Sequence, residues 1–183
     1  MKASAFVVGR EDRAGGALAQ IARDAGLDPV QRYEGLAKAE RQSKKTPLLF
    51  FLCAAVDDVR SLKPMADAIR FSPSAHLRFS PIIYFARSPS IEAIRGCINM
   101  GFDDVIALPF SAEQLRTRFA RQVGTVQIYY ETPTYFGPDR RERGAEDEAN
   151  PRRGTGGQYE RFEIIRSVEK GVEVLKDDDQ IML

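Results

Sequence analysis

Short apolar runs alternate with amphipathic stretches along the first two thirds of the chain. The runs are rich in β-branched and aromatic residues, and each falls well short of the roughly 18 apolar residues that suggest a membrane-spanning helix. Runs of this kind predict strands that are buried on both faces, as in a parallel sheet. The strongest of them are residues 4–8, 48–52, 82–86 and 105–108, and a weaker edge strand is expected at residues 30–33.

Between these runs, apolar residues recur at the spacing of one helix face. The predicted helices cover residues 14–25, 36–42, 57–71, 91–98 and 112–121, and residues 71–80 are expected to form a loop. Ser111-Ala112-Glu113-Gln114 matches a capping box ahead of the last helix. The regular alternation predicts a doubly wound α/β domain with right-handed crossovers.

The segment from Pro81 to Phe110 shows this pattern most clearly. Ser90 suits a helix N-cap after the first strand, and Gly101 suits a left-handed helix stop before the second. Strand, helix and strand within about 30 residues form a βαβ unit, which requires a parallel sheet. The apolar stripe of its helix consists of Ile91, Ile94 and Ile98.

The composition of the chain changes at Gly124. Alternating apolar residues from Val126 to Tyr130 predict a half-exposed strand, and residues 132–157 are dense in arginine, acids, glycine and proline, which is typical of a flexible linker. The last segment suits a hairpin or a helix, and Gly171 with its β-branched neighbours favours the hairpin. We therefore divide the chain into an α/β domain (1–123), a strand with a linker (124–158), and a C-terminal hairpin or helix (159–183).

The composition narrows the class of protein. The chain has 183 residues, of which 43% are hydrophobic and 29% charged, and these values are ordinary for a globular protein with one core. A net charge of +1 argues against a specific DNA-binding protein. Both cysteines lie in apolar runs and no signal peptide is evident, so we expect a cytoplasmic protein without a membrane segment.

Two short motifs flank the second strand of the βαβ unit. Met100-Gly101-Phe102-Asp103-Asp104 precedes it, and Leu108-Pro109-Phe110 follows it. In this order they resemble the last third of a bacterial response-regulator receiver domain, whose pattern is Ala-Gly-Ala-Asp-Asp, strand, Lys-Pro-Phe. The resemblance covers about residues 3–122. It implies a five-stranded parallel sheet of the receiver or flavodoxin-like type, with a cis peptide bond before Pro109.

The same resemblance locates the phosphorylation pocket, and the residues found there differ from the family pattern. A receiver uses an acidic pair and Mg²⁺, a phosphoaccepting aspartate, a hydroxyl, a lysine and a switch aromatic. The corresponding positions hold Gly9 and Arg10, Cys53, Ala86, Leu108 and Val105, in that order. We therefore predict a degenerate receiver, a pseudo-receiver, that is not an enzyme, takes no phosphoryl group and binds no cofactor or metal.

Three residues near this pocket, Cys53, Asp57 and Asp58, have alternative interpretations. Cys53 is either a redox-sensing thiol activated by Arg10 or a small buried residue. Asp57 or Asp58 either accepts phosphate in place of Cys53 or caps the following helix. His76 has no partners at metal-ligand spacing and is interpreted as a loop residue.

In receivers, the fourth helix, fifth strand and fifth helix form the usual partner surface. The resemblance therefore predicts a partner face on this chain for a signalling protein of a bacterial two-component pathway, or for a second copy in a homodimer. Its residues are Arg95, Asn99, Val105, Gln114, Arg118 and Arg121.

The arginines of the linker offer an alternative function. Paired arginines beside aromatic residues can bind phosphate oxygens and stack on a base. This resembles the arginine pair of PilZ domains and the arginine-rich tail of some receiver-like motility regulators, which implies cyclic di-GMP as a ligand. A solvated linker neutralised by its own acids is the competing interpretation. The arginines are Arg140, Arg141, Arg143, Arg152 and Arg153.

Overall fold

A computed structural model describes residues 3–10, 12–139 and 158–181, which form a five-stranded parallel sheet and a four-stranded antiparallel sheet. The order of the parallel sheet is β2-β1-β3-β4-β5. This is the strand order of flavodoxin-like doubly wound folds, so the predicted fold class is confirmed. The parallel strands are β1 (Ser4–Val8), β2 (Val30–Arg32), β3 (Leu49–Cys53), β4 (Ile82–Ala86) and β5 (Asp104–Ala107).

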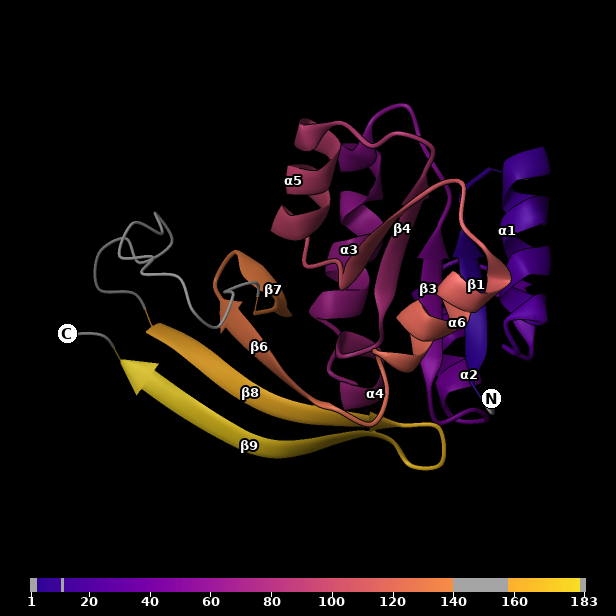
Figure 1. The fold of residues 1–183 in the computed structure, drawn as a ribbon. Helices are drawn as coiled ribbons and strands as arrows, with labels where there is room; N and C mark the ends of the chain where they lie inside the picture. The colour runs from indigo at the N-terminus through magenta and orange to yellow at the C-terminus, as the bar shows by residue number, and fades with distance from the viewer. Residues whose placement is uncertain (1–2, 11, 140–157, 182–183) are drawn as a thin grey trace.

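Helices cover both faces of the parallel sheet (Figure 1). Leu18 and Ala22 of α1 and Leu115 and Phe119 of α6 belong to one buried cluster, while the other face packs against the remaining helices. Two layers of helices around one sheet are what doubly wound connections produce. The helices are α1 (Arg13–Asp24), α2 (Leu36–Ser43), the 3₁₀ helix η1 (Val59–Leu62), α3 (Lys63–Arg70), α4 (Ala75–Arg78), α5 (Ile91–Asn99) and α6 (Ala112–Ala120).

Two helix predictions need correction. The predicted loop at residues 71–80 contains α4, because Leu77 is fully buried and the carbonyl of Ser74 accepts the amides of Leu77 and Arg78. The predicted helix from residue 57 begins as η1 and becomes α-helical at Lys63.

The orientation of α5 also differs from the simple periodic pattern. Its buried residue is Cys97, whereas Ile91 is 64% exposed. Gly96 lies so close to η1 that a Cβ atom there would be 2.7 Å from Val59 Cγ1. The helix therefore packs through its small residues Gly96 and Cys97, and the first isoleucine of the predicted apolar stripe, Ile91, faces solvent.

The C-terminal sheet has the order β7-β6-β8-β9, and all its pairings are antiparallel. The predicted hairpin is confirmed as β8 (Gln158–Ser167) and β9 (Gly171–Ile181). The linker predicted from residue 132 instead contains β7 (Tyr135–Pro138), which pairs with β6 (Val126–Thr132) and buries Phe136. Residues assigned to the second and third segments thus pair within one sheet.

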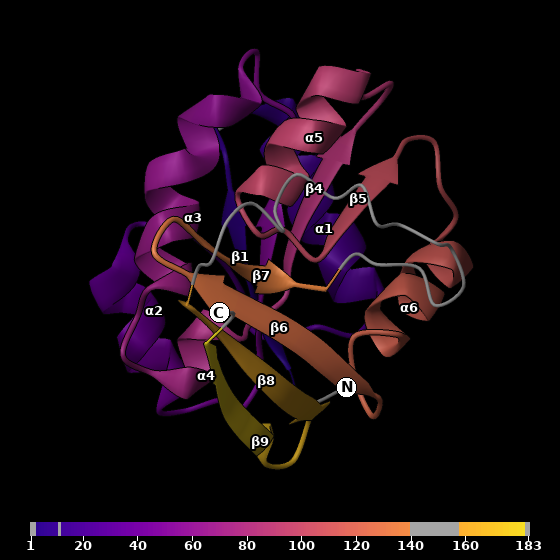
Figure 2. The ribbon, with the colours of Figure 1, turned by 90° about the vertical axis from the view of Figure 1, so that its left-hand side faces the viewer.

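A third buried cluster joins the C-terminal sheet to the α/β domain, in front of which the sheet lies in Figure 2. Its members are Phe79, Tyr129, Phe136, Phe162, Ile164 and Val172. The contacts fall on segments that precede parallel strands: a Cβ atom on Gly171 would be 2.4 Å from the carbonyl oxygen of Pro47, and Phe79 lies just before β4. The C-terminal sheet therefore covers the amino-terminal ends of β3, β4 and β5. No helix in the described part of the chain is long and apolar enough to cross a membrane.

Candidate functional site

The residues predicted for the phosphorylation pocket lie at the carboxyl ends of the parallel strands. Gly9 follows β1 and Cys53 ends β3, and Val8 and Cys53 are register partners. Ala86 ends β4, and its carbonyl accepts the amide of Leu108 at 2.8 Å. The peptide bond between Leu108 and Pro109 is cis, as the resemblance implied.

Gly9 occupies a position that disfavours an acidic metal ligand. Its φ of +145° is a conformation that side chains rarely adopt, and a Cβ atom there would be 3.0 Å from the Cβ atom of Ala54. An aspartate at this position would strain the backbone and push against the end of β3.

Cys53 belongs to the core. Its side chain is fully buried, and this burial raises the pKa of the thiol well above its ordinary value, with a further rise from Cys97 and an opposing effect of Arg70. Arg10, which would activate this thiol in the redox-sensing interpretation, is exposed. A buried neutral thiol is a poor nucleophile, so the geometry favours the interpretation of Cys53 as a packing residue.

The acids near the pocket serve as helix caps. The side chain of Asp12 accepts the amide of Gly15 at 2.9 Å, and that of Asp58 accepts the amide of Arg60 at 3.0 Å. The prediction that an acid at 57–58 caps the next helix is confirmed for Asp58. Among the described residues, no group of three His, Cys, Asp or Glu side chains could hold a metal ion.

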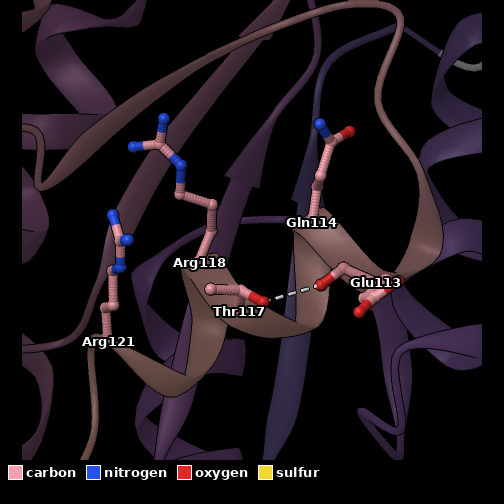
Figure 3. Close-up of a pocket in the computed structure, with 5 residues that line it drawn as sticks. All are labelled: Glu113, Gln114, Thr117, Arg118 and Arg121. Carbon is pink, nitrogen blue, oxygen red and sulfur yellow. Dashed lines mark hydrogen bonds between the residues drawn. The ribbon is translucent and has the colours of Figure 1, made fainter.

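The predicted partner face lies along the edge strand β5 and the helices on either side of it. Arg95, Asn99, Arg118 and Arg121 are exposed, while Val105 is half-buried against the core. Figure 3 shows Glu113, Gln114, Thr117, Arg118 and Arg121 lining a shallow depression along α6.

Arg118 and Gln114 of the partner face have partners inside the molecule. Arg118 pairs with Asp104 of β5 at 3.2 Å, which connects α6 to the edge strand. Gln114 completes the predicted capping box. Its side-chain oxygen accepts the backbone amide of Ser111 at 2.8 Å, and its backbone amide donates to Ser111 Oγ. Gln114 therefore helps to start α6 in addition to facing solvent.

His76 and the linker arginines have different outcomes. His76 lies in α4, where its Nδ1 accepts the amide of Val172 at 3.4 Å, so it supports the start of β9. Arg140, Arg141, Arg143, Arg152 and Arg153 lie outside the described residues. The cyclic di-GMP hypothesis thus stays an untested prediction.

Sequence reasoning missed a polar network at the opposite end of the sheet, formed by Arg70, Asp103, Tyr129 and Arg166. Asp103 Oδ2 accepts Arg70 Nη2 at 2.5 Å and the amide of Ile82 at 2.7 Å. Its Oδ1 accepts Arg166 Nη2 at 2.8 Å and the hydroxyl of Tyr129. One carboxylate therefore joins α3, β4, β6 and β8. We call these four residues the arginine–aspartate network.

Each arginine of the network also donates to neutral oxygens. Arg70 donates to the carbonyls of Gly101, Arg78 and Ser80 at 2.7–2.9 Å. Arg166 donates to the carbonyl of Phe79 and to the side chains of Gln122 and Gln127, also at 2.7–2.9 Å. Buried guanidinium groups are tolerated only when their donors are satisfied in this way.

Burial and charge act in opposite directions in the network. Burial alone would raise the pKa of the Asp103 carboxyl, but Arg166 and Arg70, with hydrogen bonds from Tyr129 and Ile82, outweigh it and lower that pKa. Burial raises the pKa of Tyr129, against the effect of Arg166. The network thus contains a carboxylate and a neutral phenol between two guanidinium groups.

One signal in the sequence pointed weakly to Arg166. It follows Phe162 and Ile164 at a spacing of two, so it faces the same buried side of β8. A charged residue in that register must have a buried partner, but the sequence does not show which one.

No protein-family model and no curated protein matches the sequence. Solved structures do resemble part of it. A candidate response regulator from Chloroflexus aurantiacus is 21% identical, with 64% of this chain and 94% of that chain covered and a TM-score of 0.46. A CheY-like protein from Pseudomonas aeruginosa is 14% identical, with 64% and 98% covered and a TM-score of 0.48. The receiver domain of a sensor histidine kinase from the same organism, which has a magnesium ion in its active-site cleft, is 17% identical, with 65% and 96% covered and a TM-score of 0.44. The strand order itself carries the conclusion that the α/β part of this chain has the receiver or flavodoxin-like fold.

Proposed function

We propose that this chain is a phosphorylation-independent, receiver-like module that binds a protein partner in bacterial signal transduction. The observation that carries the proposal is the chemistry at the carboxyl ends of the parallel strands. The positions of a receiver's acid, phosphoacceptor, hydroxyl and lysine hold Gly9, buried Cys53, Ala86 and half-buried Leu108. The site therefore lacks the aspartate that accepts a phosphoryl group in a receiver and the lysine that helps to neutralise its charge.

The partner face supports a role in binding. Ile91, which we add to the partner face, is exposed at the start of α5, and Arg95, Arg118 and Arg121 are exposed on or directly after the two helices beside β5. Exposed apolar side chains and arginines are typical of protein-binding surfaces. Cys53 and Cys97 are buried thiols that form no disulfide bond, which agrees with our proposal that the module acts in the cytoplasm.

Phosphorylation independence is tested by incubating the protein with Mg²⁺ and a small-molecule phosphodonor. We expect no mass increase of about 80 Da, the mass that a phosphoryl group would add. Asp57→Asn and Asp58→Asn variants serve as controls. A stoichiometric, acid-labile adduct on the wild type that either variant lacks would overturn the proposal and identify the acceptor.

Partner binding is tested by comparing proteins retained from bacterial lysate by the wild type and by Ile91→Glu. The matched control is Val126→Glu, because Val126 is an exposed aliphatic residue at 54% but lies on β6. We expect a protein that the wild type and the control retain and that Ile91→Glu does not. Light scattering then decides whether that partner is a second copy of this chain. Equal retention by all three would exclude the face around Ile91.

A further inference from the structure

The three elements of the partner face meet the arginine–aspartate network. Beyond α5, the carbonyl of Gly101 accepts Arg70 Nε at 2.9 Å. Asp103 immediately precedes β5. Beyond α6, the side chain of Gln122 accepts Arg166 Nη1 at 2.9 Å. The two guanidinium groups thus contact the segments that directly follow α5 and α6, and the carboxylate belongs to the residue that directly precedes β5.

The end of α6 has further bonds to the C-terminal sheet. The amide of Gly124 donates to the carbonyl of Arg166 at 2.9 Å, and Gln127 Nε2 donates to the carbonyl of Arg121 at 3.3 Å. Arg121 belongs to the partner face, and α6 is also paired to β5 through Arg118 and Asp104. A displacement of β8 would therefore reach α6 directly and β5 through Asp103.

We propose that the C-terminal sheet, acting through the arginine–aspartate network, holds α5, β5 and α6 in one fixed arrangement and so keeps the partner face permanently assembled. This inference rests on the proposed function in one respect, namely that the partner face is the surface that binds the protein partner. The sheet acts from the amino-terminal ends of the strands, opposite the pocket positions.

The physical chemistry of the network favours a single arrangement. A guanidinium group is planar and presents its donors in fixed directions, so its acceptors cannot shift independently. Moving β5 or α6 away would leave charged donors buried without acceptors, which is strongly unfavourable. A surface that is held in its binding conformation loses less conformational freedom when a partner binds.

Hydrogen exchange of the full chain, followed by mass spectrometry, tests the inference without a partner. Gln122→Ala removes one acceptor of Arg166 and leaves all charges in place. Gln31→Ala is the control, because it removes the same side chain and a part-buried hydrogen bond, to Gln42, at the other edge of the sheet and outside the network. We expect Gln122→Ala to speed exchange about tenfold in residues 97–107 and 112–122, with β1 and β3 unchanged.

A second variant covers the case in which Gln122→Ala does not fold. Tyr129→Phe keeps the ring packed on Phe79, at 5.3 Å between centroids, and removes only the hydroxyl that bonds Asp103 and Arg166. It is expected to speed exchange in the same segments. Exchange that rises equally in β1 and β3, or no more than in the control, would overturn the inference.

The same variants separate this inference from the proposed function. Faster exchange at the face with reduced partner retention supports both. Faster exchange with no partner retained even by the wild type supports the network's role and contradicts the proposed function. Unchanged exchange with partner retained by the wild type supports the function and contradicts the role of the network.

Discussion

The two ends of the parallel sheet differ in how they use charge. At the carboxyl ends, where a receiver concentrates its acids and lysine, this chain has Gly9, exposed Arg10, Cys53, Ala86 and Leu108. At the amino-terminal ends, the described residues bury two arginines and one aspartate beneath the C-terminal sheet. At the carboxyl ends, buried Cys53 and Ala86 occupy the phosphoaccepting and hydroxyl positions as packing residues. The other end tolerates buried charge because the network satisfies it.

The comparison also separates two kinds of constraint on a surface. A phosphorylation pocket changes its charge with the signal, so the elements around it can switch. The elements around a network of buried donors and acceptors cannot switch in this way, since any rearrangement leaves polar groups unpaired. This difference is why we assign this chain a partner face that is always assembled. The following predictions test the two ends against each other.

The largest effect is expected for Asp103→Ala. It leaves Arg70 and Arg166 buried without a carboxylate, and we expect the free energy of unfolding to fall by about 3–5 kcal/mol in urea denaturation. Asp104→Ala is the matched control, because its partner Arg118 is 47% exposed and such pairs contribute about 0–1 kcal/mol. Similar losses for the two variants would contradict the importance of the network.

Gly101→Ala tests the contact between β7 and the α/β domain. Gly101 has φ +76°, and a Cβ atom there would lie 2.0 Å from the carbonyl oxygen of Phe136. Gly124→Ala is a control with nearly the same φ of +77° and open space around it, so it measures the backbone cost alone, about 1–2 kcal/mol. We expect Gly101→Ala to lose clearly more stability in thermal denaturation, because β7 must move. Equal losses would show that β7 is not held against Gly101.

The pH dependence of stability follows from Asp103. Its pKa in the folded protein is lowered, so its carboxylate stabilises the fold above the unfolded pKa of about 3.9, and this contribution is lost as the pH falls through the folded pKa. In urea denaturation below about pH 5, we expect the stability of the wild type to fall more steeply than that of Asp103→Asn. Parallel pH profiles would show that Asp103 is not the group that titrates.

The smallest effect is expected at the carboxyl ends, for Leu108→Lys. Full burial of a lysine without a partner would cost about 1–3 kcal/mol, but Leu108 is only half-buried and the lysine stem can reach solvent. We therefore expect a loss of about 1 kcal/mol or less in urea denaturation, with Leu108→Gln as the uncharged control. A gain in stability would instead mean that an acid still reaches the pocket.

The sequence predicted the elements whose causes are local. Apolar runs such as Leu48–Leu52 predict buried parallel strands. Gly171, with φ +82°, begins β9 after the turn of the predicted hairpin. β7 was missed because its four residues include Gly137 and Pro138, and its stability comes from pairing with β6 and from burial of Phe136.

The candidate sites show the same division. Strand ends can be located from periodicity and resemblance, so residues such as Cys53 and Ala86 were expected at the carboxyl ends of the strands where they lie. The arginine–aspartate network depends on contacts across the fold, since Arg166 and Asp103 are 63 residues apart. The face on which α5 packs was equally unpredictable, because it depends on how closely Gly96 approaches Val59.

A double-mutant cycle between Asp103→Asn and Arg166→Gln tests the central claim most directly, with Cys53→Ala and Leu108→Ala as the reference cycle at the carboxyl ends. Urea denaturation gives the free energy of unfolding of each single and double variant. We predict a coupling energy of at least about 1 kcal/mol for Asp103 and Arg166, and additivity within about 0.5 kcal/mol for Cys53 and Leu108. Additive losses at Asp103 and Arg166, or a larger coupling energy at the carboxyl ends, would contradict the account.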